Sequence, residues 1–168
     1  MTAVAAPTAP PALLREDAEL PWVDLGGGIE IKVLQVALDA GVWSVRNRFA
    51  PGTVVQTHTH TGPVNAFTET GSWFYAEYPH EVNRPGSYLF EPAGSTHTLT
   101  VPASNTEPTL VWFVITGANL NLAPDGSVER VVDAAAILRR YKLEIAALGL
   151  PPVSVIGDPE AVVHAEQA

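Results

Sequence analysis

The most regular hydrophobic pattern in the chain is the alternation over residues 43–49, which read Trp-Ser-Val-Arg-Asn-Arg-Phe. Side chains on a β-strand point to opposite faces in turn, so Trp43, Val45 and Phe49 would share one face and the two arginines the other. Between residues 29 and 122, short apolar runs are separated by turn signals such as Pro51-Gly52 and Gly62-Pro63. Many short strands with turns at close intervals predict an all-β sandwich or barrel.

Near the C-terminus the hydrophobic period changes to that of a helix. Asp133 can cap the start of this helix, and Gly149 followed by Pro151-Pro152 can end it. We expect one helix over about 133–148, which covers the outside of the barrel or meets a partner subunit. Its apolar positions are Ile137, Leu138, Tyr141, Ile145 and Leu148.

The first 20 residues are rich in Ala and Pro and then in mixed charges, which predicts a flexible arm. The expected organisation is therefore an N-terminal arm (1–20), one β-barrel domain (21–125), and a C-terminal helix with a tail (126–168). The tail after Pro152 has no informative pattern.

Composition restricts the possible partners. The 168 residues carry a net charge of −9, which argues against nucleic acid and against an anionic membrane. No apolar run is long enough to span a bilayer, and the N-terminus lacks the basic start of a signal peptide. The absence of cysteine excludes disulfides and thiolate ligands. We expect a cytoplasmic protein that acts on a small molecule.

Three histidines are the main candidates for chemistry. His58 and His60 are separated by one residue, so in a strand both imidazoles lie on the same face. His97, from a later strand, can complete a cap on a divalent ion. Imidazole suits iron, zinc, copper and nickel better than calcium or magnesium. The predicted metal ligands are His58, His60 and His97.

Glycines and a proline surround these histidines at regular spacings. Five residues separate Gly52 from His58, and five separate Gly86 from Pro92, which is followed by Gly94 and, after two more residues, by the third histidine. This sequence closely resembles the two spacing motifs of the cupin superfamily, G(X)5HXH and G(X)5PXG(X)2H. The resemblance implies a cupin fold: a double-stranded β-helix, or jelly-roll barrel. The glycines would supply tight turns with positive φ.

One ligand of the general cupin pattern is missing. That pattern places a glutamate seven residues before the closing glycine, here Gly71, and the residue at that position is Val64. Glu69 falls on the opposite strand face. The site should therefore hold three neutral imidazoles without a carboxylate, so that a bound ion keeps its +2 charge and open positions. We expect Val64 to lie near the ion without touching it.

Three segments resemble one particular group of cupins, the three-histidine cupin dioxygenases. They are residues 58–64, 71–73 and 86–98, and the similarity as a whole covers roughly residues 21–122. The group is identified as the 2,4'-dihydroxyacetophenone dioxygenase family, with the acetylacetone (β-diketone) dioxygenases as relatives. The resemblance implies a non-haem Fe(II) enzyme that uses O₂ to cleave a C–C bond of an aryl α-hydroxyketone or β-diketone. Zinc and nickel remain possible metals. Exposed edge strands in such folds favour a homodimer or homotetramer.

Glu91 lies six residues before His97 and has two interpretations. It is either a solvated carboxylate at a strand end, or a group that holds an imidazole N–H or accepts a proton from an enol. The family resemblance favours the second interpretation and makes Glu91 the candidate catalytic residue. The other histidines have no such context: His80 should be exposed in a turn, and His164 should take no part in metal binding.

Strand phase predicts the neighbours of the histidines. If His58 and His60 point inward, Val54 and Gln56 should do so too, as should Val64 and Ala66 on the returning strand. The aromatic residues are expected to be core packing rather than substrate contacts. They are Trp43, Trp73, Phe74, Tyr75, Tyr88, Phe90 and Trp112.

Functions outside this enzyme class remain open. One is a cupin that senses a metal or ligand, such as the cupin halves of anti-sigma factors, although the lack of cysteine argues against redox sensing. Another is a metal-free cupin, or one with Zn or Ni, that acts as an isomerase or hydrolase. Because fold does not determine function, metal analysis and O₂ uptake are needed to separate them.

Overall fold

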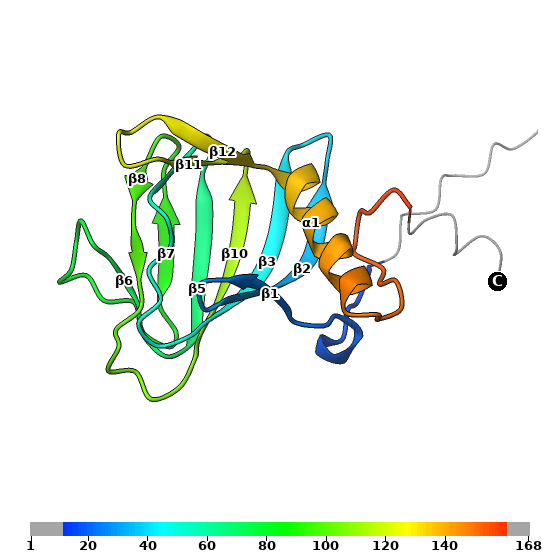
Figure 1. Ribbon diagram of the computed structural model, residues 1–168, viewed down its shortest axis with the longest axis horizontal. Helices are drawn as coiled ribbons and strands as arrows, with labels where there is room; N and C mark the ends of the chain where they lie inside the picture. The colour runs from blue at the N-terminus through cyan, green and yellow to red at the C-terminus, as the bar shows by residue number, and fades with distance from the viewer. Residues whose placement is uncertain (1–11, 161–168) are drawn as a thin grey trace, which may run out of the picture.

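The computed structural model describes residues 12–160, which form three antiparallel sheets and one C-terminal helix (Figure 1). The six-stranded sheet has the order β1 (Val23–Gly26), β2 (Ile29–Ala37), β3 (Val42–Phe49), β10 (Thr109–Thr116), β5 (Val64–Thr70) and β7 (Tyr88–Glu91). The four-stranded sheet has the order β12 (Val128–Val132), β11 (Asn119–Leu122), β4 (His58–His60) and β8 (Thr96–His97). A third sheet pairs β6 (Phe74–Tyr75) with β9 (Leu99–Thr100).

The core lies on the inner face of the six-stranded sheet, where every second side chain of a strand points inward. Trp43, Val45 and Phe49 on β3 are all buried, as predicted, and Val111 and Phe113 on the neighbouring β10 are buried in the same phase. Burying an apolar side chain of this size stabilises the fold by roughly 1.5–3 kcal/mol. This inner face therefore holds the barrel together and forms the wall of any cavity inside it.

The predicted helix is present as α1 (Ala134–Ala147). The side chain of Asp133 accepts a hydrogen bond from the backbone N–H of Ala136 (2.7 Å), which confirms the predicted cap. At the other end, Gly149 has a φ of +68° and the N–H of Leu150 reaches the carbonyl of Ile145, the arrangement of a Schellman motif. Leu148 is exposed rather than packed, because it is the capping residue beyond the last turn.

α1 packs beside β2, and Figure 1 shows it at one end of the barrel. No helix in residues 12–160 has the length and apolar composition needed to cross a bilayer.

The packed part of the chain extends beyond the expected barrel limits of 21 and 125. β12 completes the four-stranded sheet although it lies in the segment expected to hold only helix and tail. At the N-terminal side a short 3₁₀ helix, η1 (Asp17–Glu19), precedes the buried Leu20. Val155 in the tail is also buried, and Ile156 pairs with Gln35 of β2. Residues 1–11 of the predicted arm lie outside the described residues.

The aromatic residues divide between the interior and the surface of the molecule, and Phe74 is half-buried. Trp43, Trp73 and Tyr75 are buried, as expected of core residues. The same expectation is wrong for Tyr88, Phe90 and Trp112, which are 56%, 55% and 41% exposed. Their strand phase explains this: each alternates with residues that point inward, so these side chains must point outward. Aromatic character was therefore a weaker signal than strand phase.

Candidate metal centre

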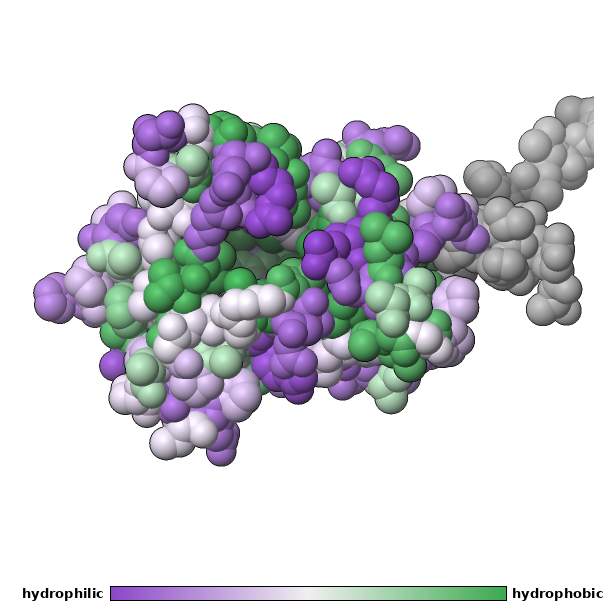
Figure 2. Space-filling model, viewed as in Figure 1, coloured by the Kyte–Doolittle hydropathy of each residue, from purple (hydrophilic) through white to green (hydrophobic). Residues whose placement is uncertain are grey.

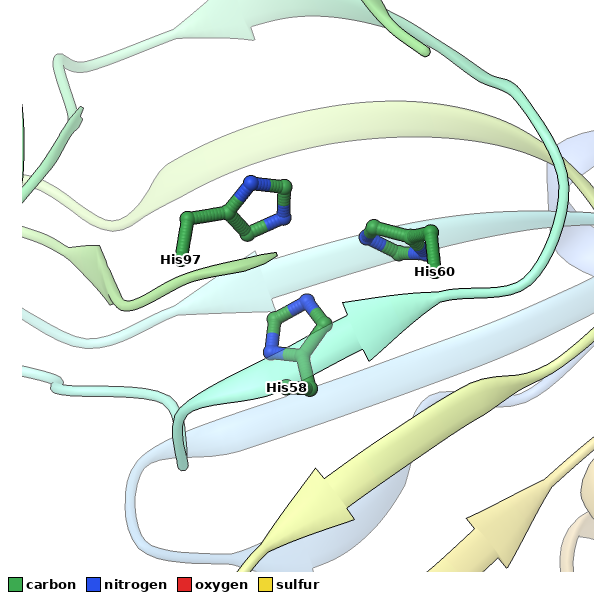
Figure 3. Close-up of side chains that lie close together, drawn as sticks. All are labelled: His58, His60 and His97. Carbon is green, nitrogen blue, oxygen red and sulfur yellow. The ribbon is translucent and has the colours of Figure 1, made fainter. Parts of the chain in front are cut away.

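The three predicted ligands lie together on two adjacent strands. β4 carries His58 and His60, and β8 places His97 directly opposite His58. The ring centroids are 4.8, 4.9 and 5.0 Å apart, and all three side chains are buried. One nitrogen of each ring faces the space between the rings (Figure 3), and the three potential ligand atoms lie within 4.8 Å of one another. Among residues 12–160, they are the one group of His, Cys, Asp and Glu arranged to hold a metal ion.

The turn that leads into β8 is tied to β4 through the backbone. Gly94 has a φ of +84°, and its N–H donates to the carbonyl of His60 (2.7 Å). The N–H of His60 in turn donates to the carbonyl of Ser95 (3.0 Å). A positive φ at this position is readily adopted only by glycine, which explains the Pro-X-Gly spacing before His97. The second motif thus places the third imidazole against the first pair.

His58 is held in one tautomer. Its Nδ1 lies 2.8 Å from the carbonyl oxygen of Gln56 and must donate a proton to it, which leaves the lone pair of Nε2 free. Burial lowers the pKa of His58 to about 4, and the bond to Gln56 offsets only part of this effect. At neutral pH this imidazole is therefore uncharged, the form that binds metals.

Glu91 is buried inside the barrel at 3% exposure, so the solvated interpretation is wrong. It pairs with Val64 across β7 and β5, and this register brings the carboxylate to the histidines from a neighbouring strand. Its Oε2 lies 2.8 Å from Nε2 of His60 and 3.3 Å from Nε2 of His97. Burial raises the pKa of Glu91, but His60, His97 and the hydroxyl of Tyr75 outweigh burial and hold the pKa at about 2.

Tyr75 is a site residue that the sequence did not reveal. Its ring stacks on the imidazole of His97 with a centroid distance of 3.8 Å and an interplanar angle of 14°. Its hydroxyl donates to Oε1 of Glu91. Burial, followed by the charge of Glu91, raises the pKa of Tyr75, so the hydroxyl stays protonated and remains a donor. Nothing in the local sequence distinguishes this tyrosine from a core aromatic.

Buried polar atoms at this site lack partners that a cation would provide. Nδ1 of His60 and Nε2 of His97 are both buried, yet neither has a hydrogen-bond partner within the described residues. Buried polar groups are rarely left unpaired. Three imidazoles around a small space beside a carboxylate suit a divalent transition metal, so the residues present fit such an ion.

The other phase predictions for the site are largely confirmed. Val64 and Ala66 are fully buried, and Val64 is the strand partner of Glu91, whereas Glu69 points outward and pairs with Arg46. The prediction that Val54 points inward is wrong: its side chain is exposed, because the regular strand begins only at residue 58. Gln56 is half-buried and donates to the carbonyl of Leu122.

The two remaining histidines stand apart from the metal centre. His80 is exposed, as expected. His164 lies outside the described residues.

A cavity of about 360 Å³ opens from the histidines toward the molecular surface. Figure 2 shows a hollow in this face, with hydrophobic residues inside it and hydrophilic residues around it. Its size is that of a small-molecule site. The apolar residues lining it include Ile31, Trp43, Val45, Phe49, Phe113 and Ile115, and the polar ones include His58, His60, Glu91, Asn119, Asn121, Arg130 and Arg140.

Comparison with known proteins agrees with this architecture. The family model described as the ChrR cupin-like domain matches residues 11–119. The chain belongs to this cupin family, and the predicted cupin fold with a C-terminal helix is confirmed. A search of curated proteins gives no match.

Three solved structures illustrate the likeness. A Ralstonia eutropha JMP134 protein of unknown function with a cupin-like fold is 33% identical, with a TM-score of 0.81 over 89% of this chain and 94% of that one. An acetylacetone dioxygenase from Acinetobacter johnsonii is 18% identical, with a TM-score of 0.69 over 85% and 98%. A chain in the structure of Rhodobacter sphaeroides SigE in complex with the anti-sigma ChrR is 16% identical, with a TM-score of 0.50 over 60% of this chain and 52% of that one. The last two share the fold alone.

Proposed function

We propose that the protein is a non-haem Fe(II) dioxygenase that cleaves a C–C bond of an aryl α-hydroxyketone or a β-diketone with O₂, in the manner of the 2,4'-dihydroxyacetophenone dioxygenases. One observation carries the proposal: a group of three buried histidines lies at an open, largely apolar cavity, which two of them, His58 and His60, line directly. An acetylacetone dioxygenase with the same fold supports it.

The charge of the site favours an anionic chelating substrate. His58, His60 and His97 would hold the ion through neutral nitrogens, so its +2 charge would be offset only by the nearby Glu91 carboxylate. An enolate or enediolate that chelates through two oxygens supplies the missing negative charge. When bound, Fe(II) would supply Lewis acidity and the reaction with O₂.

The protein residues would prepare the substrate. Glu91 is ionised, and its Oε2 lies beside the imidazoles, so it can accept the proton of a ketone that chelation has made more acidic. Tyr75 fixes the carboxylate through Oε1 and leaves Oε2 facing the site. The apolar wall around Phe113 positions an aryl group and excludes water.

The overall reaction balances without another reductant. For an α-hydroxyketone, the bond between the carbonyl carbon and the hydroxyl-bearing carbon breaks. Both atoms of O₂ enter the products, and two carboxylic acids result. The four electrons that reduce O₂ come from the two substrate carbons, so no external electron donor is needed.

A second function is favoured by the family itself. The family model is named for ChrR, and a complex of the anti-sigma ChrR shares the fold, so a metal- or ligand-sensing role is the main alternative. A Zn or Ni isomerase or hydrolase would use the same three imidazoles. These alternatives predict metal binding without consumption of O₂.

One experiment separates these functions. The protein is loaded anaerobically with Fe(II), Zn(II) or Ni(II), and O₂ uptake is followed after addition of 2,4'-dihydroxyacetophenone. We expect uptake only with Fe(II), one O₂ per ketone, and no uptake by His97→Ala loaded in the same way. No uptake by the Fe(II) protein with this ketone or with 4-(hydroxyacetyl)benzoate, or equal turnover with Zn(II), would reject the dioxygenase proposal.

A further inference from the structure

The metal-binding histidines belong to a row of side chains that crosses the whole four-stranded sheet. His97 pairs with His58 on β4, His58 pairs with Asn121 on β11, and Asn121 pairs with Arg130 on β12. Residues directly opposite each other on antiparallel strands project to the same face of the sheet. All four side chains therefore lie on the face that carries the metal centre, and Arg130 is the far end of this row.

Arg130 lies at the rim of the same cavity. It lines the cavity, yet it is an exposed residue, whereas the histidines at the inner end are buried. Two strand spacings separate the backbones of His58 and Arg130, or about 10 Å. An aryl-sized molecule that reaches the imidazoles with one end would bring its other end to the guanidinium.

The guanidinium of Arg130 has no partner among residues 12–160. It makes no ion pair and no side-chain hydrogen bond there, whereas Arg140, the other arginine at the cavity, is paired with Glu144 (2.6 Å). The nearby Glu129 is bound to Gln56 instead. In a protein with 18 acidic and only nine basic side chains, an arginine without a carboxylate partner at a cavity rim is available to a ligand.

The cavity thus has a charged group at each end and an apolar middle. The buried His58, His60 and Glu91 line it at one end and the exposed Arg130 at its rim, and Phe113 and Ile115 are among its apolar lining residues. Arginine binds carboxylates through two parallel N–H donors, and its charge would also attract an anion toward an otherwise acidic protein.

We propose that Arg130 binds a carboxylate at the end of the substrate remote from the metal, so that the substrate class is a carboxylated aryl ketone rather than a neutral one. This inference rests on the proposed function for the reacting end of the molecule. The anion site itself depends only on Arg130 and the cavity. It makes Arg130 a specificity-determining residue.

The test compares two substrates and two variants. The substrates are 4-(hydroxyacetyl)benzoate and its neutral counterpart with a 4'-hydroxyl group. Arg130→Gln keeps much of the side-chain length and removes the charge. Arg139→Gln is the matched control, because Arg139 is exposed on α1 and does not line this cavity. We expect the wild type to prefer the carboxylate substrate in kcat/KM, mainly through KM.

In Arg130→Gln this preference should fall by about tenfold, the scale of one charge-assisted contact at a solvent-exposed position. Arg139→Gln should keep the wild-type preference. Two results would reject the carboxylate-binding role of Arg130 and leave the dioxygenase proposal intact. One is equal cleavage of both ketones by the wild type, and the other is an unchanged preference in Arg130→Gln.

A binding measurement separates the two failures. Calorimetry with 4-(hydroxyacetyl)benzoate and the Zn(II)-loaded protein needs no turnover. About tenfold weaker binding by Arg130→Gln, even where neither ketone is cleaved, would retain the anion site and reject only the dioxygenase. Equal binding by both variants and the wild type would overturn the site.

Discussion

The most direct test of the metal centre is the replacement Glu91→Gln. The amide keeps the shape of the side chain, and its oxygen can still accept the hydrogen bond from the hydroxyl of Tyr75. It removes the negative charge and the basic oxygen that lies 2.8 Å from Nε2 of His60. The variant therefore isolates the chemical role of the carboxylate from its packing.

The expected effect follows from where Glu91 lies. A group that orients a metal-bound imidazole contributes about 10–100-fold, and a positioned general base about 10²–10⁴-fold. We expect metal content near that of the wild type and O₂-dependent cleavage reduced by at least roughly tenfold on those scales. Metal content is measured by atomic absorption, and cleavage by an oxygen electrode under saturating substrate.

Two further variants sharpen the comparison. Tyr75→Phe keeps the ring that stacks on His97 and loses only the donor to Glu91, so its loss should be smaller than that of Glu91→Gln. Glu69→Gln changes an outward-facing carboxylate and should leave cleavage unchanged. Full cleavage by Glu91→Gln would refute its catalytic role. Loss of the metal from this variant would instead show that Glu91 is a direct ligand, and the site would not be one of three neutral imidazoles.

Other predictions concern metal binding, pH and packing. His97→Ala should lose most of its metal while circular dichroism shows an intact fold; metal content equal to that of the wild type would exclude the three-histidine site. The metal-free protein should be most stable above pH 6.5 and lose up to about 3 kcal/mol by about pH 4, because the unfolded chain binds a proton on His58 that the buried imidazole rejects. Urea titrations of His58→Asn should show a correspondingly smaller loss, and an equal loss would contradict the assignment. Gly157→Ala should lower the free energy of unfolding by more than the roughly 1–2 kcal/mol expected for a left-handed residue alone, since its Cβ would also collide with the carbonyl of Val36. Gly149→Ala, with a similar positive φ and open space, should show the backbone cost only, and equal costs would mean that the tail does not pack as described.

Local sequence patterns were sufficient for much of this protein. The period of two over 43–49 determined which side chains enter the core, because side-chain direction on a strand depends only on position along it. The Asp133 cap and the Gly149 end of α1 were equally readable, since capping involves neighbours within a few residues. The spacing around His58, His60 and His97 matched the cupin motifs and so predicted that these three histidines form one group, which the structure confirms.

The tertiary structure decided which strands lie side by side, and this determined the rest of the site. Glu91 reaches the histidines because β7 pairs with β5 in one register, and a shift of one residue would turn it outward. Tyr75 reaches His97, and Arg130 continues the row from His58, only through pairings between distant segments. Strand periodicity specifies the face of each side chain but not its neighbours across the sheet. Those neighbours depend on long-range hydrogen bonding and packing, which no local pattern contains.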